Sequence, residues 1–183
     1  GYLPQSPPPL ARWTRRTVVA LTVGALAVAG LCAFLQRDMP AASFEYSTAR
    51  ALRGRIQLEP TPLLWVEHPG GEANGRSGYL LVAPGKHGAR ALVEPWSGQA
   101  VELSGKLIWR DGATMVEVVP GTIRATEAAP PLPESTALGS VTLAGEIVDG
   151  KCTLGVMIPG AGKPHRDCAV RCISGGAPPL LLM

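Results

Sequence analysis

Four residues near the C-terminus have side chains and a spacing that could do chemistry. They are three thiols and one imidazole, namely Cys152, His165, Cys168 and Cys172. Cys168 and Cys172 are four residues apart, so a helix over residues 166–173 would place both thiols on one face, next to His165. The run Ser174-Gly175-Gly176 is expected to end this helix.

Three states are open to this cluster: a disulfide, a metal site or free thiols. In an oxidising compartment, a disulfide from Cys152 to either Cys168 or Cys172 would tie the segment together. A bridge within one helical turn is less favourable, because its Cα separation lies near the upper limit for a disulfide. Three thiolates and an imidazole also form a four-ligand set that suits tetrahedral zinc. Apart from this zinc alternative, we expect no cofactor.

Catalysis has little support in the sequence. A thiolate–imidazole pair could form between His165 and one of the neighbouring thiols, but no orienting acid accompanies it at a suitable spacing. Asp149 and Asp167 are interpreted as turn and helix-start residues. Haem-attachment, nucleotide-loop and H-E-x-x-H motifs are absent from the sequence. We therefore predict that the protein is not an enzyme.

The cysteine segment, residues 145–183, resembles a pattern in uncharacterised bacterial exported or membrane-anchored proteins. The pattern is G-x-[IV]-x-D-x-x-C, then H-x-x-C-x-x-x-C, then a Gly/Pro-rich turn into an apolar strand. The matching residues here are Gly145, Ile147, Asp149, Cys152, His165, Cys168, Cys172, Gly175 and Pro178. The resemblance implies a cysteine-bearing insertion on an OB-like β unit, and it implies no particular reaction.

The elements that must position these residues are mostly strands. With 22 glycines and 18 prolines, the chain favours short strands and many turns. Short apolar or alternating runs predict strands at residues 52–58, 63–66, 79–82, 91–93, 101–109 and 115–119. Arg110-Asp111-Gly112 predicts a hairpin turn between the last two. These strands favour a small OB-like barrel, with a β-sandwich as the alternative.

A second β unit is expected after a proline- and alanine-rich linker. Leu143-Ala144-Gly145-Glu146-Ile147 matches the opening of the first unit, Leu52-Arg53-Gly54-Arg55-Ile56. Residues 141–183 could therefore form the front of a second, incomplete barrel that carries the cysteine helix. The overall prediction is a mainly β protein behind one N-terminal membrane helix.

That membrane helix is predicted from Thr17–Leu35, a stretch without a charged residue. A helix of this length covers most of the ~30 Å hydrocarbon core of a bilayer. Arg12, Arg15 and Arg16 precede it, so the N-terminus is expected in the cytoplasm and the β units in the periplasm. A cleaved signal peptide and a twin-arginine export signal are the alternatives. We expect a retained single span in a bacterial inner membrane.

One face of this helix predicts a protein partner within the bilayer. Small residues recur along it, namely Gly24, Ala25, Ala29 and Ala33. Such residues allow a second helix to approach closely, and helices associate in lipid through this kind of packing.

The charge of the chain does not suggest a nucleic-acid partner. The net charge of +3 includes the basic flank of the helix, and the chain lacks the basic stripe that binds nucleic acid.

Six segments follow from these patterns. We expect a proline-rich, basic cytoplasmic N-terminus, a membrane helix, a connector, an OB-like domain, a linker and the cysteine unit, at residues 1–16, 17–36, 37–49, 50–124, 125–140 and 141–183. Within the first segment, residues 1–10 are expected in an extended polyproline conformation. We also expect the natural chain to extend before Gly1 or beyond Met183, because Met183 falls inside an apolar run.

Two functions are consistent with this organisation. The first is a non-catalytic accessory subunit of a bacterial membrane complex, of a photosynthetic or respiratory kind, whose partners are other membrane subunits and the bilayer. The second is an independent anchored periplasmic module that binds a metal ion or carries out thiol redox at its Cys/His cluster. The sequence leaves open the partner complex, the state of the cysteines and the oligomeric state.

Overall fold

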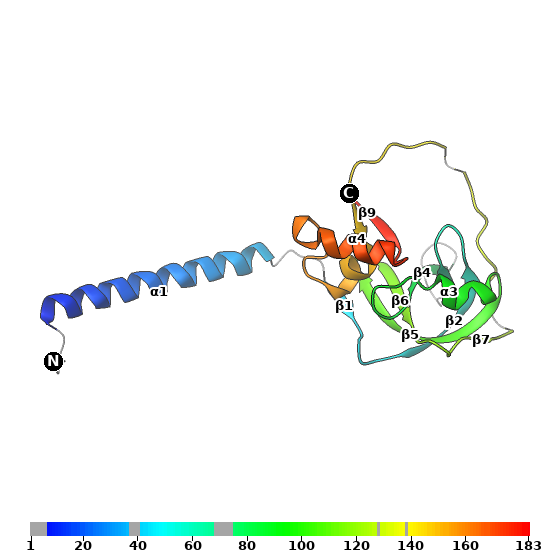
Figure 1. Ribbon diagram of the computed structural model, residues 1–183, viewed down its shortest axis with the longest axis horizontal. Helices are drawn as coiled ribbons and strands as arrows, with labels where there is room; N and C mark the ends of the chain where they lie inside the picture. Colours follow the sequence, from blue (N-terminus) through cyan, green and yellow to red (C-terminus); the bar gives the residue numbers. More distant parts are fainter. Residues whose placement is uncertain (1–6, 37–40, 68–74, 128, 138) are drawn as a thin grey trace. The chain divides into compact units, whose positions relative to one another are not determined.

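The computed structural model describes residues 7–36, 41–67, 75–127, 129–137 and 139–183. The chain divides into two units, Gly1–Pro40 and Ala41–Met183. In the first unit, the predicted membrane segment lies within one long helix, α1 (Pro8–Gln36) (Figure 1). By length and composition, Pro8–Leu35 could cross a membrane, and a signal sequence near an N-terminus has the same properties.

Helix α1 begins earlier than the sequence analysis expected. An extended polyproline conformation was predicted for the N-terminus, but Pro8 is already helical, and residues 1–6 lie outside the described part of the chain. The carbonyl of Pro7 accepts the N–H of Ala11 at 3.0 Å, which closes the first helical turn. Prolines are tolerated in that turn because its N–H groups have no intrahelical partner. The correction therefore applies to residues 8–10.

The second unit is built on a closed five-stranded barrel, which confirms the barrel expected from the sequence. Its strands are β2 (Arg50–Gln57), β3 (Leu63–Glu67), β4 (Arg76–Val82), β5 (Ala100–Arg110) and β6 (Ala113–Val118). Their order is β5-β2-β3-β4-β6, and a further pairing of β5 with β6 closes the ring. The β4–β6 pair is parallel, whereas the other neighbours in the ring are antiparallel.

Two short strands extend the sheet beyond the barrel. β1 (Ala42–Phe44) and β7 (Arg124–Ala125) both pair antiparallel with the long strand β5. The barrel strands pack tightly enough that a Cβ atom at Gly54 would overlap the main-chain carbonyl of Trp65. A glycine at this position lets the long strand β2 curve over its neighbour.

Alternation along the strands fills the barrel with apolar side chains. Its buried core includes Ile56, Leu64, Leu81, Val93, Val101, Leu103, Val116 and Val118. The predicted turn between β5 and β6 is confirmed, with positive φ angles of 50° at Asp111 and 77° at Gly112. Positive φ at both central residues is typical of the type I′ turn that favours tight hairpins.

One predicted strand is wrong. Ala91-Leu92-Val93 belongs to a short helix, α3 (Arg90–Val93), which leads into the 3₁₀ turn η1 (Glu94–Trp96). Val93 is fully buried in the barrel core, so burial explains why this run is apolar. A three-residue apolar run has no period that distinguishes a helix from a strand.

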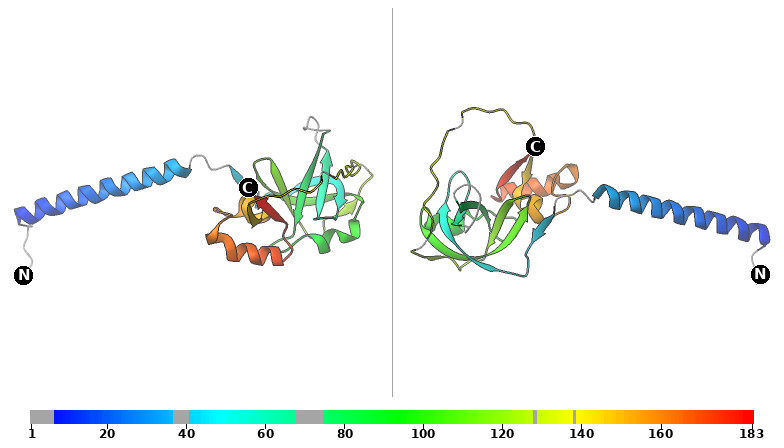
Figure 2. Two further views of the ribbon diagram at one scale, coloured as in Figure 1. Left: turned by 90° about the horizontal axis from the view of Figure 1, so that it is seen from above. Right: turned by 180° about the vertical axis from the view of Figure 1, so that it is seen from behind.

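The cysteine segment packs against the barrel within the same unit. It contains strand β8 (Glu146–Asp149), the π-helical turn η2 (Cys152–Val156), the 3₁₀ turn η3 (Lys163–His165), helix α4 (Arg166–Ser174) and strand β9 (Pro179–Leu182). β8 and β9 form an antiparallel two-stranded sheet beside α4 (Figure 2). Among the described residues of 141–183, these two strands make up the expected second β unit, and they do not form a second barrel.

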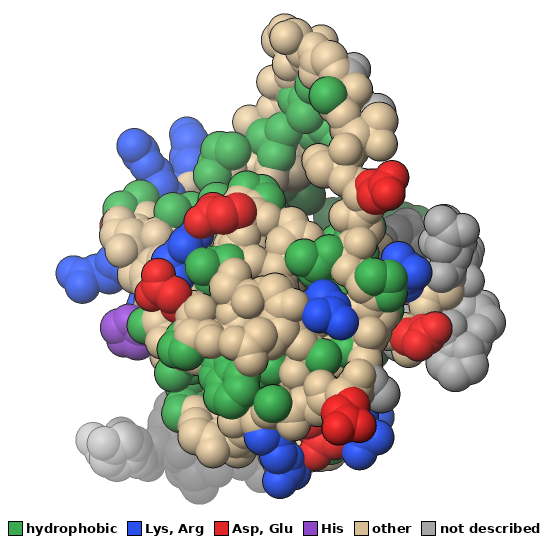
Figure 3. Space-filling model, turned by 90° about the vertical axis from the view of Figure 1, so that its right-hand side faces the viewer, with side chains coloured by type: hydrophobic (Ala, Val, Ile, Leu, Met, Phe, Trp, Pro, Cys, Tyr) green, Lys and Arg blue, Asp and Glu red, His purple; other side chains and the backbone are tan. Residues whose placement is uncertain are grey.

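A second hydrophobic core joins this segment to the barrel. Barrel residues Val82, Ile108 and Met115 contact residues of the cysteine segment, namely Cys152, Leu154, Cys172 and Ala177. On the face shown in Figure 3, side chains of both charge signs are interspersed among apolar ones. The shared core thus holds the cysteine segment against the barrel.

Candidate metal centre

Asp149 ends strand β8 and starts the turn that carries the first cysteine. Its Oδ1 accepts hydrogen bonds from the N–H groups of Lys151, at 3.0 Å, and Cys152, at 3.2 Å. A carboxylate in this position satisfies N–H groups that the first turn of η2 leaves unpaired. Asp149 is fully buried, and Cys152 is 5 % exposed. The predicted turn role of Asp149 is therefore confirmed, and the same side chain fixes where Cys152 begins.

Helix α4 supplies the other two thiols. The predicted helix over 166–173 is confirmed by α4, which ends at Ser174 with Gly175 as its C-cap, within the run expected to end it. Cys168 and Cys172 lie one turn apart, and their Sγ atoms are 4.0 Å from each other. The carbonyl of Cys172 accepts the N–H of Ala177 at 2.9 Å, so the chain after the helix turns back beneath it.

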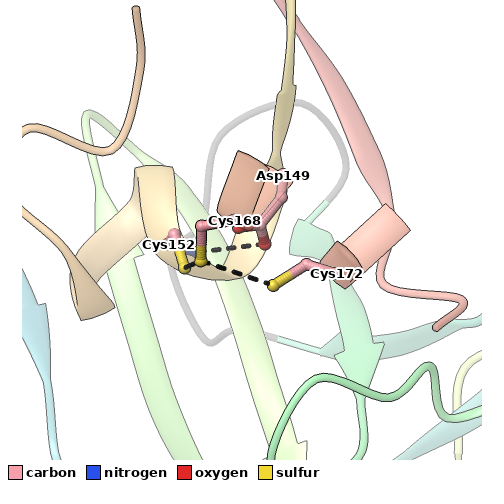
Figure 4. Close-up of side chains that lie close together, drawn as sticks. All are labelled: Asp149, Cys152, Cys168 and Cys172. Carbon is pink, nitrogen blue, oxygen red and sulfur yellow. Dashed lines mark hydrogen bonds between the residues drawn. The ribbon is translucent and has the colours of Figure 1, made fainter. Parts of the chain in front are cut away.

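The three thiols and one carboxylate converge on a common point. Cys152 Sγ lies 4.0 Å from Cys168 Sγ, and one ligand atom from each of Asp149, Cys152, Cys168 and Cys172 lies within 4.8 Å of the others (Figure 4). These four residues are called the Cys3Asp cluster. They come from β8, η2 and α4, and their side chains point toward one another.

The structure contains no disulfide between the described cysteines, which was one of the three states considered for the cluster. All four cysteines of the chain are free thiols, including the exposed Cys32 of α1. The 4.0 Å separations are about twice a bonded S–S length of ~2.05 Å. Cys168 Sγ lies at the same distance from the other two sulfurs, so no two of the thiols are paired in preference to the third. The three thiols are instead arranged around a common point.

His165 lies behind the Cys3Asp cluster, outside the set of four converging atoms. Its Nε2–H donates to Asp149 Oδ2 at 3.3 Å, and the imidazole is 3 % exposed. The ligand set predicted from the sequence therefore changes in one member: Asp149 takes the place expected for His165. The imidazole belongs to η3, immediately before α4, and its contact with Oδ2 orients the carboxylate.

Lys86 brings a positive charge to the cluster from the barrel. It follows β4, and its Nζ donates to Cys168 Sγ at 3.4 Å. The loop is held against α4 because Gly88 N–H donates to the carbonyl of Gly175 at 2.8 Å. A Cβ atom at Gly88 would overlap Gly176, so only glycine permits this close approach. The hydrogen bond to Cys168 is the largest cause of a raised pKa at Lys86.

A buried ion pair lies beside the thiols. Lys151 Nζ is 2.6 Å from Glu117 Oε2, and the two side chains are 6 % and 9 % exposed. The same ammonium donates to the carbonyls of Ala83, at 3.1 Å, and Gly85, at 2.7 Å. Because it holds both ends of the turn that precedes Lys86, Lys151 links the cysteine segment to the lysine that contacts Cys168.

Burial keeps two of the thiols protonated. Desolvation, followed by the hydrogen bond and charge of Asp149, raises the pKa of Cys152 far above its usual range. Desolvation, followed by the charge of Asp149, raises the pKa of Cys172 to about 11. Thiols of this kind are poor nucleophiles near neutral pH because the thiolate is the reactive form. A metal ion would displace these protons on binding.

The remaining predicted residues lie in α1. Gly24, Ala25, Ala29 and Ala33 are exposed, as are Arg12, Arg15 and Arg16. Asp149, Lys86 and the Glu117–Lys151 pair were missed as cluster residues by the sequence analysis. For Asp149 a signal existed in the D-x-x-C spacing to Cys152, whereas Lys86 and Glu117 reach the cluster only through the fold.

The described residues thus define a class of protein: a closed β-barrel body that carries a buried Cys3Asp cluster, preceded in the chain by one apolar helix. Comparison with known proteins assigns nothing further, because no protein family, curated protein or solved structure matches the chain.

Proposed function

We propose that this chain is a membrane-anchored protein that binds a thiolate-preferring divalent metal ion, zinc above all, through Cys152, Cys168, Cys172 and Asp149. The observation that carries the proposal is the 4.0 Å spacing of the sulfurs. A tetrahedral ion with Zn–S bonds of about 2.3 Å holds its sulfur ligands about 3.8 Å apart. Loading the ion would therefore require only small movements of the side chains.

The donor atoms favour zinc over hard cations. Three sulfurs and one carboxylate oxygen match the ligand types that zinc takes, whereas magnesium and calcium select oxygen ligands. The supporting shell has the form common at metal sites, in which a hydrogen bond orients a ligand from behind. Here His165 holds Asp149, and Lys86 holds Cys168.

Thiol redox and nucleophilic catalysis receive less support from the same geometry. The raised pKa values of Cys152 and Cys172 disfavour the thiolates that both reactions need. A non-catalytic role, as expected from the sequence, is part of the proposal. Nucleic acid is not proposed as a partner, because the sequence contains no concentrated basic stripe, and charges of both signs are interspersed on the face shown in Figure 3.

The barrel that carries the cluster is proposed to be OB-like. Support comes from its five strands, from the parallel pairing of β4 with β6, and from the helix α3 between β4 and β5. We further propose that α1 is a retained anchor in a bacterial inner membrane, with the β body in the periplasm. Exposed apolar side chains along α1 and the basic residues before its apolar stretch support this orientation. The relationship to exported bacterial proteins with the same cysteine pattern belongs to this proposal.

A role as an accessory subunit of a membrane complex, of a photosynthetic or respiratory kind, is compatible with metal binding. The feature that favours it is the row of small residues along α1, namely Gly24, Ala25, Ala29 and Ala33, all of which are exposed. Close approach of a second helix is what small residues permit in a bilayer.

Metal content tests the proposed function. The full chain would be purified in detergent under reducing conditions, supplied with Zn²⁺, desalted and analysed for zinc. We expect one zinc per chain in the wild type and in Cys32→Ser, a matched control because Cys32 lies in α1. Cys168→Ser and Cys172→Ser should lose at least about 90 % of the metal, since each removes a thiolate ligand. A wild-type chain without zinc, or a Cys172→Ser chain that retains it, would contradict the proposal.

A further inference from the structure

The Cys3Asp cluster forms one wall of a cavity. The cavity has a volume of about 680 Å³, and Cys152, Cys168 and Cys172 all line it. Asp149 does not line it and is fully buried. An ion held by the three sulfurs would therefore have its carboxylate on one side and the cavity on the other. A zinc site with four protein ligands is structural when it is closed off, whereas a site that faces a cavity can accept an exogenous ligand that joins or replaces one protein ligand.

The other walls of this cavity are mainly apolar. They are formed by Phe44 of β1, by the end of β6 and the residues after it, and by η2, and the apolar lining residues include Tyr46, Val118, Val119, Pro120, Val156 and Met157. The volume lies in the range of small-molecule sites, about 300–1,000 Å³. The size and lining therefore suit an organic molecule with an apolar body.

Charge balance around the cavity indicates an uncharged ligand. Three thiolates and the Asp149 carboxylate carry four negative charges, of which a divalent ion cancels two. The lining lysines, Lys86, Lys106 and Lys151, outnumber the lining acid, Glu117, by two. The loaded cluster and the lining charges thus cancel, so an anionic head group gains no net attraction here.

The hydrogen bonds that Asp149 already accepts limit how it can bind a metal ion, which leaves room for a donor from the cavity. Its two oxygens already receive the N–H groups of Lys151 and Cys152 and the Nε2–H of His165. These bonds occupy both lone pairs of Oδ1 and one of Oδ2, so the carboxylate can offer only one oxygen to an ion. A nitrogen or sulfur donor from the cavity could add to the ion or take the place of the carboxylate.

We propose that the cavity binds a small, uncharged molecule with an apolar body and one nitrogen or sulfur donor, which reaches the metal ion beside Cys152, Cys168 and Cys172. This inference rests on the proposed metal site. The apolar body would occupy the walls formed by β1, η2 and the end of β6. The donor would point toward the sulfurs.

The test uses the full chain loaded with Co²⁺, whose visible absorption reports its coordination. The probe is 4-phenylimidazole, with imidazole as the donor without an apolar body and phenylacetate as the anionic comparison. We expect 4-phenylimidazole to change the spectrum and to bind about tenfold to a hundredfold more tightly than imidazole, because its ring is buried against the apolar walls. Phenylacetate should bind more weakly than 4-phenylimidazole.

Two variants separate the cavity from the metal. Val156→Phe fills the cavity and should weaken 4-phenylimidazole at least about fivefold. Val170→Phe is the matched control, because Val170 is exposed on α4 and does not line this cavity. If Co²⁺ binds but 4-phenylimidazole leaves its spectrum unchanged, or binds Val156→Phe as well as wild type, the inference is overturned and the proposed function stands. If Co²⁺ does not bind, both are overturned.

Discussion

His165 donates a hydrogen bond from Nε2 to Oδ2 of Asp149 across 3.3 Å, and both side chains are buried. The contact fixes the orientation of the carboxylate whose other oxygen caps the turn into Cys152. The imidazole is thus a positioning group for a metal ligand.

Removal of this imidazole should weaken metal binding without abolishing it. His165→Ala is expected to lower zinc affinity about tenfold to a hundredfold, since groups that orient a ligand from behind have effects of this size. Competition with a chelator measures the affinity, and His87→Ala is the control because His87 is exposed in a loop. A loss as complete as that in Cys172→Ser would make His165 a direct ligand, contrary to the structure.

The buried pair Lys151–Glu117 should be costly to break from one side. Lys151→Met leaves the Glu117 carboxylate buried, with Lys106 3.9 Å away as its remaining partner. We expect a loss of about 3 kcal/mol in unfolding free energy, at the lower end of the cost of breaking a buried pair, because Lys106 at 3.9 Å compensates the buried carboxylate less well than Lys151 at 2.6 Å. Denaturant unfolding followed by circular dichroism measures it. The double variant Lys151→Met/Glu117→Gln should recover part of the loss, and equal losses in the single and double variants would argue against the pair.

Glu102 should account for part of the loss of folding stability at low pH. Hydrogen bonds from Arg53 and Arg124 lower the pKa of its carboxyl, so the charged form is favoured in the folded state. A group with a lowered folded pKa contributes stability above its ordinary pKa of about 4.3, and this stability is lost as pH falls through the lowered value. Glu102→Gln should therefore have a lower Tm than wild type at pH 7 and the same Tm in strong acid. A difference in Tm that persists unchanged at low pH would contradict this assignment.

The small-residue face of α1 should determine association in the membrane. In the double variant Ala25→Leu/Ala29→Leu, larger side chains would block close helix approach and release the chain from a larger complex on a native gel. Val23→Leu/Ala27→Leu is the matched control, because these positions lie on the opposite face at 100° per residue. If the control variant is released equally, the face has no special role. A wild-type chain that migrates alone would contradict association itself.

Local patterns predicted the parts of the fold that depend on neighbouring residues. The turn at Asp111 and Gly112 and the helix that carries Cys168 and Cys172 could be predicted because each depends on a few consecutive residues. The helical run Ala91-Leu92-Val93 was missed because burial makes short helices and short strands equally apolar.

The cluster itself depends on contacts that are distant in the sequence. Asp149 was interpreted as a turn residue, and the structure shows that the capping carboxylate also faces the thiols. Lys86 reaches Cys168 only because Gly88 allows its loop to contact the end of α4. No spacing in the sequence predicts that contact, since it results from closure of the barrel and docking of α4.

The central claim is tested most directly by X-ray absorption at the zinc edge of the zinc-loaded full chain. The Cys3Asp cluster predicts three sulfur ligands at about 2.3 Å and one oxygen ligand at about 2.0–2.2 Å. It also predicts no multiple-scattering signature of a bound imidazole, because His165 lies behind Asp149. A zinc ion surrounded only by oxygen and nitrogen, or one bound by an imidazole, would contradict the account.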